Sequence, residues 1–192
     1  MARVSKQQME RHREEIISVS SALFRERGLN GVSVNDLMAA AGLTHGGFYG
    51  HFNSKDDLAA IASRKAFDDS RARWEAMPGH RDLHALVEHY LSPDHRDGVQ
   101  GGCAIAALAS DIARESPDKP VRNVWLEGVE GMLAMLESVS DCGDEAQRRQ
   151  QALMQLALLT GALTLARATS GDGLSDEFLT AAKDALLAEK KI

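Results

Sequence analysis

The 192-residue chain has little of what marks secreted, disulfide-stapled or membrane proteins. Its two cysteines, Cys103 and Cys142, are too few for a disulfide scaffold at this length. The most apolar window, 152–166, is interrupted by polar residues and is shorter than the roughly 20 apolar residues of a membrane span. The N-terminal residues are charged and contain no apolar stretch typical of a signal peptide. We therefore expect a cytoplasmic protein in a reducing compartment, with no membrane as partner.

Residues that favour β-strands are also scarce. Valine and isoleucine together number 16, against 50 alanines and leucines, and all four prolines lie between positions 78 and 120. The composition predicts an all-α fold. Apolar spacing and capping residues predict about nine helices, with a polar loop at 92–100. They cover 6–27, two short segments between 33 and 52, 54–77, 83–91, a segment from 103 that ends before Pro117, 119–139, 145–169 and 174–190.

Motifs of the common enzyme classes are missing as well. The chain has no Gly-x-Ser-x-Gly elbow, no phosphate-binding loop and no dinucleotide fingerprint. His80 and His84 have the spacing of metal ligands, but no cysteine pair or acidic zinc motif accompanies them. We predict that the protein is not an enzyme and that it holds no metal ion and no cofactor.

The segment 28–55 is the most informative part of the chain. Ser33 and Asp36 have the spacing of a capping box, Gly42 suits a left-handed helix end, and Thr44 is placed to cap the next helix. Two short helices joined by a tight glycine turn fit a helix-turn-helix motif, and they equally fit a corner in a helical bundle. Spacing alone does not decide between these two interpretations.

Specific residues in this region decide between them. The stretches are Ile16-x6-Leu23-Phe24-x3-Gly28, Gly31-Val32-Ser33-Val34, Ala41-Gly42-Leu43-Thr44 and Phe48-Tyr49-x-His51-Phe52-x-Ser54-Lys55-x-x-Leu58. With them, residues 13–58 resemble the DNA-binding domain of the tetracycline-repressor (TetR) family of transcriptional regulators. The aromatic-rich tail is not a general feature of helix-turn-helix proteins, so the resemblance is specific. It covers about a quarter of the chain; the remainder agrees with the family only in length and helix content.

The resemblance implies a homodimer that binds double-stranded operator DNA, with the second short helix in the major groove. By position, the groove face would be Thr44, His45, Gly46 and Gly47, and the phosphate contacts would be Ser33, Tyr49, His51 and Lys55. Hydroxyl groups, a phenol and an ammonium group are common phosphate partners.

Charge is distributed unevenly along the chain. The net charge is −6, yet residues 1–55 carry seven basic against five acidic residues, which leaves +2 there and −8 on the remainder. The acidic total argues against indiscriminate coating of nucleic acid, while the positive N-terminal segment suits a local DNA contact. We predict a DNA-binding domain at 1–55 and an effector-binding and dimerisation domain at 56–192.

The resemblance also implies a small-molecule effector and a dimer interface in the second domain. We take as pocket candidates the aromatic and polarisable residues of the middle helices, which are Trp74, Tyr90, Cys103, Trp125, Met132 and Met135. Small and apolar residues at helical spacing in the last two helices predict the interface or, alternatively, intrachain core. They are Leu153, Leu156, Ala157, Gly161, Thr164, Leu179, Ala182 and Leu186.

Together these features predict a sequence-specific transcriptional regulator. We expect a repressor that a small-molecule effector releases from a palindromic operator. The alternative is a helical ligand-binding or protein-interaction module that has no DNA-binding activity.

Overall fold

The computed structural model describes residues 5–79, 81–140 and 142–188. These ranges contain helices and no strand, which confirms the all-α prediction. Arg3, His80 and the expected extension of the last helix to Lys190 lie outside the described residues. The elements, in chain order, are α1 (Lys6–Arg27), α2 (Val34–Ala40), the 3-10 helix η1 (His45–Gly50), α3 (Lys55–Ala76), α4 (Leu83–Tyr90), α5 (Pro93–Asp97), the 3-10 turn η2 (Val99–Gly101), α6 (Ala104–Arg114), α7 (Pro120–Ser138), α8 (Glu145–Ala168) and α9 (Gly173–Leu187).

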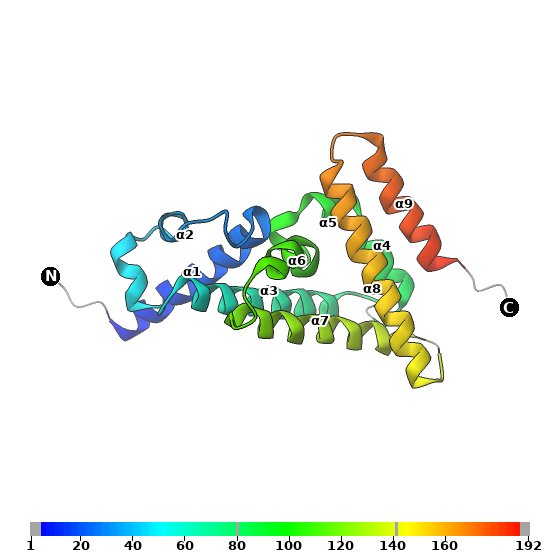
Figure 1. Ribbon diagram of the computed structural model, residues 1–192, viewed down its shortest axis with the longest axis horizontal. Helices are drawn as coiled ribbons and strands as arrows, with labels where there is room; N and C mark the ends of the chain where they lie inside the picture. Colours follow the sequence, from blue (N-terminus) through cyan, green and yellow to red (C-terminus); the bar gives the residue numbers. More distant parts are fainter. Residues whose placement is uncertain (1–4, 80, 141, 189–192) are drawn as a thin grey trace.

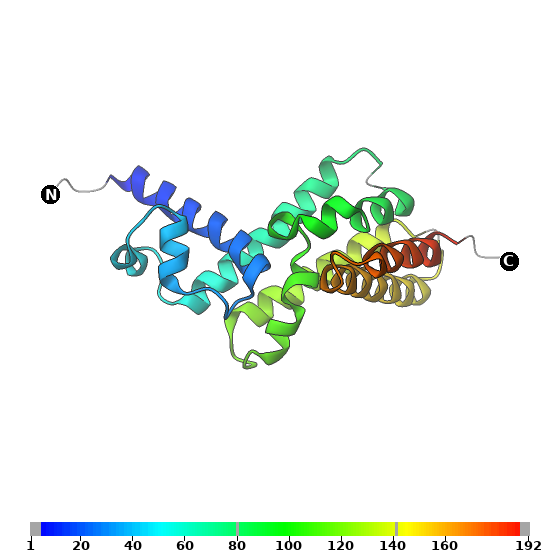
Figure 2. The same cartoon turned by 90° about the horizontal axis from the view of Figure 1, so that it is seen from above.

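The molecule is elongated, with its two ends built from different parts of the chain (Figure 1). Helices α1 and α2 and the segment η1 form one end, while α8 and α9 lie side by side at the other (Figures 1 and 2). Helices α3 and α7 run side by side along the length between them. None of the helices among the described residues has both the length and the hydropathy needed to cross a membrane.

The hydrophobic interior consists of two clusters that α3 connects. The first surrounds Phe24 and Phe48 at the N-terminal end and includes Leu58 from the start of α3. The second lies among α4, α8 and α9 and includes Trp74 from the end of α3. The ring of Phe67, midway along α3, packs against both clusters. Because one continuous helix takes part in both, the N-terminal end is firmly tied to the rest of the chain.

Two local expectations from the sequence were wrong. The stretch 92–100, expected to be a polar loop, contains α5 and part of η2 because Ser92 caps the His95 amide and Pro93 occupies the first turn. The segment after Thr44 is a 3-10 helix, and the Thr44 side chain makes no capping hydrogen bond. The pair Gly46-Gly47 lowers α-helix propensity there, so the tighter and shorter form is reasonable.

Candidate DNA-binding and ligand-binding sites

Helix α2 and the turn after it are built as their sequence predicts. The Ser33 hydroxyl accepts a hydrogen bond from the Asp36 amide, and the Asp36 carboxylate accepts from the Ser33 amide at 2.8 Å, which completes a capping box. The Ser33 hydroxyl and amide both donate to the Asp36 carboxylate, and these two bonds lower the pKa of Asp36. Gly42 ends the helix with φ +68°, a left-handed conformation that glycine adopts without strain. The polypeptide therefore turns sharply into η1.

Segment η1 separates buried from exposed aromatic side chains. Phe48 is fully buried and its ring lies 5.6 Å from that of Phe52. Tyr49, the next residue, is 68% exposed, and its ring meets that of His45 edge-on. The two phenylalanines anchor the segment, so that it presents one exposed face to solvent. The predicted groove residues Thr44, His45, Gly46 and Gly47 are all exposed, and Thr44, Gly46 and Gly47 also line a small cavity under the segment.

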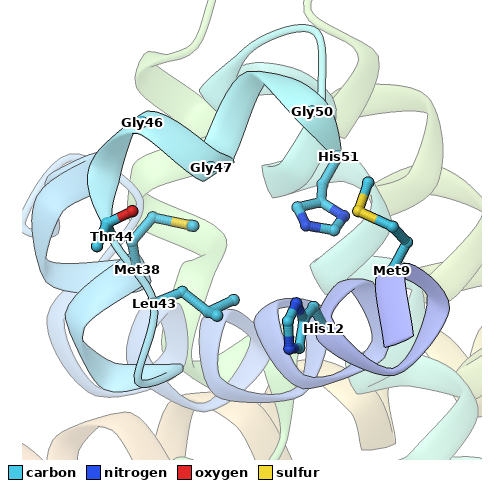
Figure 3. Close-up of a pocket in the computed structure, with 9 residues that line it drawn as sticks. All are labelled: Met9, His12, Met38, Leu43, Thr44, Gly46, Gly47, Gly50 and His51. Carbon is cyan, nitrogen blue, oxygen red and sulfur yellow. The ribbon is translucent and has the colours of Figure 1, made fainter. Parts of the chain in front are cut away.

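A small cavity of about 240 Å³ lies beneath η1, between that segment and α1. Figure 3 shows the side chains of His12 and His51 pointing into it, opposite Met38 and Leu43. The two imidazole rings are 6.3 Å apart. Burial, with smaller contributions from His12 and Arg13, lowers the pKa of His51. The ring of His51 is therefore uncharged near neutral pH, and an approaching phosphate group would favour its protonation.

Lys55 and Ser33 stand at helix starts. Lys55 is the first residue of α3 and Ser33 caps α2, so both lie where backbone N–H groups favour anions. The predicted groove and phosphate residues thus all lie within one short region of the N-terminal end.

A much larger cavity, of about 1130 Å³, lies between α3, α4, α6 and α7. Five of the six predicted pocket residues line it; these are Trp74, Tyr90, Cys103, Met132 and Met135. The sixth, Trp125, does not line it but packs edge-on against the lining residue Phe67, with ring centroids 6.0 Å apart.

Three arginines surround the segment 101–103 at one wall of this cavity. The Arg73 Nη2 atom donates to the Gly101 carbonyl at 2.6 Å, and the Arg25 Nη1 atom donates to the Gly102 carbonyl at 3.1 Å. Arg167 donates to the carbonyls of two α5 residues. A Cβ atom at Gly102 would lie only 2.6 Å from Arg167 Nη2, so a side chain there would crowd the cluster.

Sequence reasoning missed these arginines, although the chain contains a signal for one of them. Ile17, Ser21 and Arg25 follow one another at intervals of four, and all three are buried in α1. An arginine at helical spacing with buried residues indicates a guanidinium group with partners inside the protein.

His95 joins the same wall to α4. Its Nδ1 atom lies 2.7 Å from the Tyr90 carbonyl oxygen, and its Nε2 atom accepts a hydrogen bond from the Cys103 amide at 3.0 Å. These partners require a neutral ring with the proton on Nδ1. Burial lowers the pKa of His95 to about 4, which agrees with that state.

Comparison with known proteins gives a family match over the N-terminal segment described above. Residues 16–61 match the family model "Bacterial regulatory proteins, tetR family". This segment of the chain belongs to the TetR family. A curated relative, the HTH-type transcriptional repressor KstR2 of Rhodococcus jostii strain RHA1, is 39% identical over 101 residues, which span 52% of this chain and 50% of KstR2. The chain therefore matches about half the length of this relative.

Other comparisons extend over most of the chain. The HTH-type transcriptional repressor NemR of Escherichia coli strain K12 is 24% identical over 163 residues, 78% of this chain and 81% of NemR. The crystal structure of reduced E. coli NemR superposes with a TM-score of 0.75 at 21% identity, covering 92% of this chain and 95% of that one. A TetR transcriptional regulator from Chloroflexus aurantiacus gives 0.74 at 25% identity, with 94% of both chains covered.

The residues predicted for a dimer interface divide into two groups. Leu153, Ala157, Gly161 and Thr164 are exposed on α8. By contrast, Leu156, Leu179 and Ala182 are buried in the core of their own chain, and Leu186 packs partly against it. The side chains of these buried residues hold α8 to α9 within one chain and are not available to a second copy. The exposed side of α8 instead carries three large apolar side chains that were not predicted, Met154, Leu158 and Leu165.

Proposed function

We propose that the protein is a homodimeric transcriptional repressor that a small molecule releases from operator DNA. The observation that carries this proposal is the exposed face of η1, held in place by buried Phe48 and Phe52 within the matched TetR segment. The curated relatives KstR2 and NemR are named as transcriptional repressors, which supports the same function here. The large cavity between α3, α4, α6 and α7 is the proposed effector site.

The exposed side of α8 supports the homodimer. Leu153 is 49% exposed and Met154 66% exposed, and Leu158 and Leu165 continue the apolar surface along the helix. Half of the large apolar side chains that are exposed among the described residues lie on this one helix. An apolar helix face of this kind marks an interface. Packing α8 and α9 against the same pair of a second copy would form a four-helix interface around a two-fold axis.

Two hydrogen bonds offer a physical route from the cavity to the DNA-binding end. Arg25 of α1 binds the Gly102 carbonyl, and the Leu29 amide donates to the Asp111 carboxylate of α6 at 3.1 Å. An effector that moves the start of α6 would therefore shift α1 and the η1 segment packed on it. Opposite shifts in two protomers would change the spacing of the paired recognition segments and favour release.

Gel-shift measurements with DNA from upstream of the chain's own coding sequence test this function. We expect salt-sensitive, sequence-specific retardation that Tyr49→Ala and Lys55→Ala both weaken. The control is Arg114→Ala, which also removes one positive charge but from the exposed end of α6, and it should leave retardation unchanged. Lys55→Ala should also reduce the steepness of the salt dependence by about one phosphate contact.

The opposite result favours the alternative class of protein. Absence of retardation with genomic DNA fragments at any salt concentration would indicate a helical ligand-binding module without DNA-binding activity. If Lys55→Ala and Arg114→Ala lose the same affinity for DNA, the protein is attracted to DNA only by its overall charge.

A further inference from the structure

We propose, on the basis that the large cavity is the effector site proposed above, that its ligand is an amphipathic organic anion. The anionic group would lie at the N-terminus of α6, beside the Tyr90 hydroxyl. The apolar body of the ligand would extend along the part of the cavity formed by α3 and α7.

The N-terminus of α6 is open toward the cavity. Cys103 precedes the helix without making a side-chain capping bond, and the first turn contains no acidic residue. Cys103, Ala104 and Ile105 all line the cavity. The first amides of an α-helix have no partner within the helix, and their partial positive charge favours an anion.

Tyr90 supplies a second and independent indication of a ligand. Its side chain is only 6% exposed and lines the cavity, and its hydroxyl group has no hydrogen-bond partner of normal geometry. Burial is the main reason that its pKa is raised well above the usual value; the nearby Cys103 thiol raises it further, by its charge and by a loose hydrogen bond, and Arg167 lowers it. A buried hydroxyl group whose polar neighbour is a weakly bonding sulfur is costly, and an oxygen acceptor at the α6 N-terminus would satisfy it.

The surrounding charge also favours an anion over a neutral ligand. Arg25, Arg73 and Arg167 all lie around the segment 101–103, and each donates to backbone carbonyls. The carboxylates that act on Arg25 and Arg167 are Asp69 and Asp97, which are already paired with Lys65 and Arg96. The Arg167 Nη1 atom is buried without a partner. When these two carboxylates are counted with Lys65 and Arg96, the described residues around this wall carry a net positive charge.

The rest of the cavity suits an apolar body. Trp74, Leu86 and Ile105 line it with buried side chains, and Met132 and Met135 add flexible apolar surface. Three carboxylates line the cavity: Asp68 and Glu127 are paired with the lining residues Arg71 and Arg64, and Glu75 is exposed to solvent. This arrangement fits a ligand that has an anionic group at one end and an apolar body.

Three probes that share a ten-carbon chain and differ in head group test the proposal: decanoate, decanol and decyltrimethylammonium. Binding to the full chain is measured without DNA by calorimetry and by tryptophan fluorescence, which comes from Trp74 in the cavity lining and from Trp125. We expect decanoate to bind about tenfold more tightly than decanol, and the cationic probe to bind more weakly than both. Tyr90→Phe should weaken decanoate binding about tenfold and leave decanol unchanged. It removes only the unpartnered hydroxyl, so the fold should be retained.

Arg114→Gln is the control, because it also removes one positive charge, from an exposed side chain at the end of α6 that does not line the cavity. It should change decanoate affinity by no more than about twofold. The proposal is wrong if decanoate does not bind, if it binds no more tightly than decanol, or if Tyr90→Phe leaves its affinity unchanged. Operator binding by the ligand-free chain is a separate measurement. If the ligand-free chain still retards operator DNA while any of these results is obtained, the proposal of an anionic ligand is contradicted and the proposed repressor function is not.

Discussion

The guanidinium group of Arg25 in α1 donates a hydrogen bond to the carbonyl of Gly102, two positions before the first residue of α6, across 77 positions of sequence. A second donor of the same side chain, Nε, binds the Ser21 carbonyl within α1. One buried arginine thus fixes the helix that carries the DNA-binding end to the wall of the large cavity. Burial, together with the nearby Arg73, lowers the pKa of Arg25, so the group stays charged at some cost and depends on these carbonyls.

Removal of this link should destabilise the protein. We expect Arg25→Gln to lower the free energy of unfolding by about 1–3 kcal/mol, because two carbonyl groups lose a charged donor. Arg27→Gln is the control: Arg27 is exposed and pairs only with the adjacent Glu26, and its loss should have little effect. Urea unfolding of both variants measures the difference, and equal stabilities would show that the Arg25 link contributes nothing.

Local rules of helix formation predicted most of the fold from the sequence. Ser33, Gly42 and Ser54 stand at helix ends as their side chains and backbone preferences require. The rules failed for Ser92-Pro93, which was interpreted as loop although serine followed by proline is itself a signal for a helix start.

The interface residues show why burial is harder to predict than helicity. Helix α8 is apolar on both sides, so periodicity alone does not tell which side packs against α9. The spacing predicts Leu156 and Leu153 together, for the interface or for the core, yet the structure buries Leu156 and exposes Leu153. Similarly, chemical type alone selected Trp125 for the cavity, whereas its contact with Phe67 depends on how α3 and α7 pack.

The exposed side of α8 should hold the dimer together. We expect Leu153→Asp combined with Met154→Asp to weaken dimerisation at least about tenfold, because a symmetric interface would bury each new charge twice. Leu126→Asp is the control, since Leu126 is 61% exposed on α7 rather than on α8. Sedimentation at several concentrations distinguishes the two. If the dimer dissociation constant of the α8 variant is unchanged, or if the Leu126→Asp control dissociates, the interface lies elsewhere.

We predict that Gly46 and Gly47 of η1 favour DNA binding and lower the stability of the fold. No atom lies within 4 Å of a Cβ added at Gly46, and only Met38 makes ordinary contact at Gly47. We expect Gly46→Ala combined with Gly47→Ala to stabilise the fold by about 0.5–1 kcal/mol per residue. It should nevertheless weaken operator binding, because the methyl group at Gly46, which meets no other atom of the chain, would be added to the face proposed to enter the groove.

The control for the glycine pair is Gly42→Ala, which places alanine at φ +68° and should destabilise the fold by about 1 kcal/mol. Thermal unfolding and gel shifts of the same preparations give both quantities. Unchanged operator affinity in the double variant would remove these glycines from the DNA contact.

Stability should fall in mild acid because of His95. The pKa of this residue is about 4 in the folded chain, below the ordinary value of 6.5. Between these two values the unfolded state binds a proton that the folded state excludes, so stability is present above pH 6.5 and is lost as the pH falls toward 4. The loss should not exceed about 3 kcal/mol.

His95→Gln should flatten this part of the pH profile, even though it also removes the ring contact with Tyr90. His84→Gln, on an exposed residue of α4, is the control and should keep the slope of the unmodified chain. Urea unfolding at pH values from 7.5 to 4 checks the profile. An identical slope in the His95 variant would assign the acid sensitivity to other groups.

Footprinting of the ligand-free protein on its operator tests the central claim most directly. A symmetric dimer that inserts two η1 segments should protect two palindromic half-sites with centres about 34 Å apart, one helical turn of DNA. Tyr49→Ala should weaken both half-sites equally. Protection of a single asymmetric site, or none at concentrations where the dimer is intact, would contradict the account.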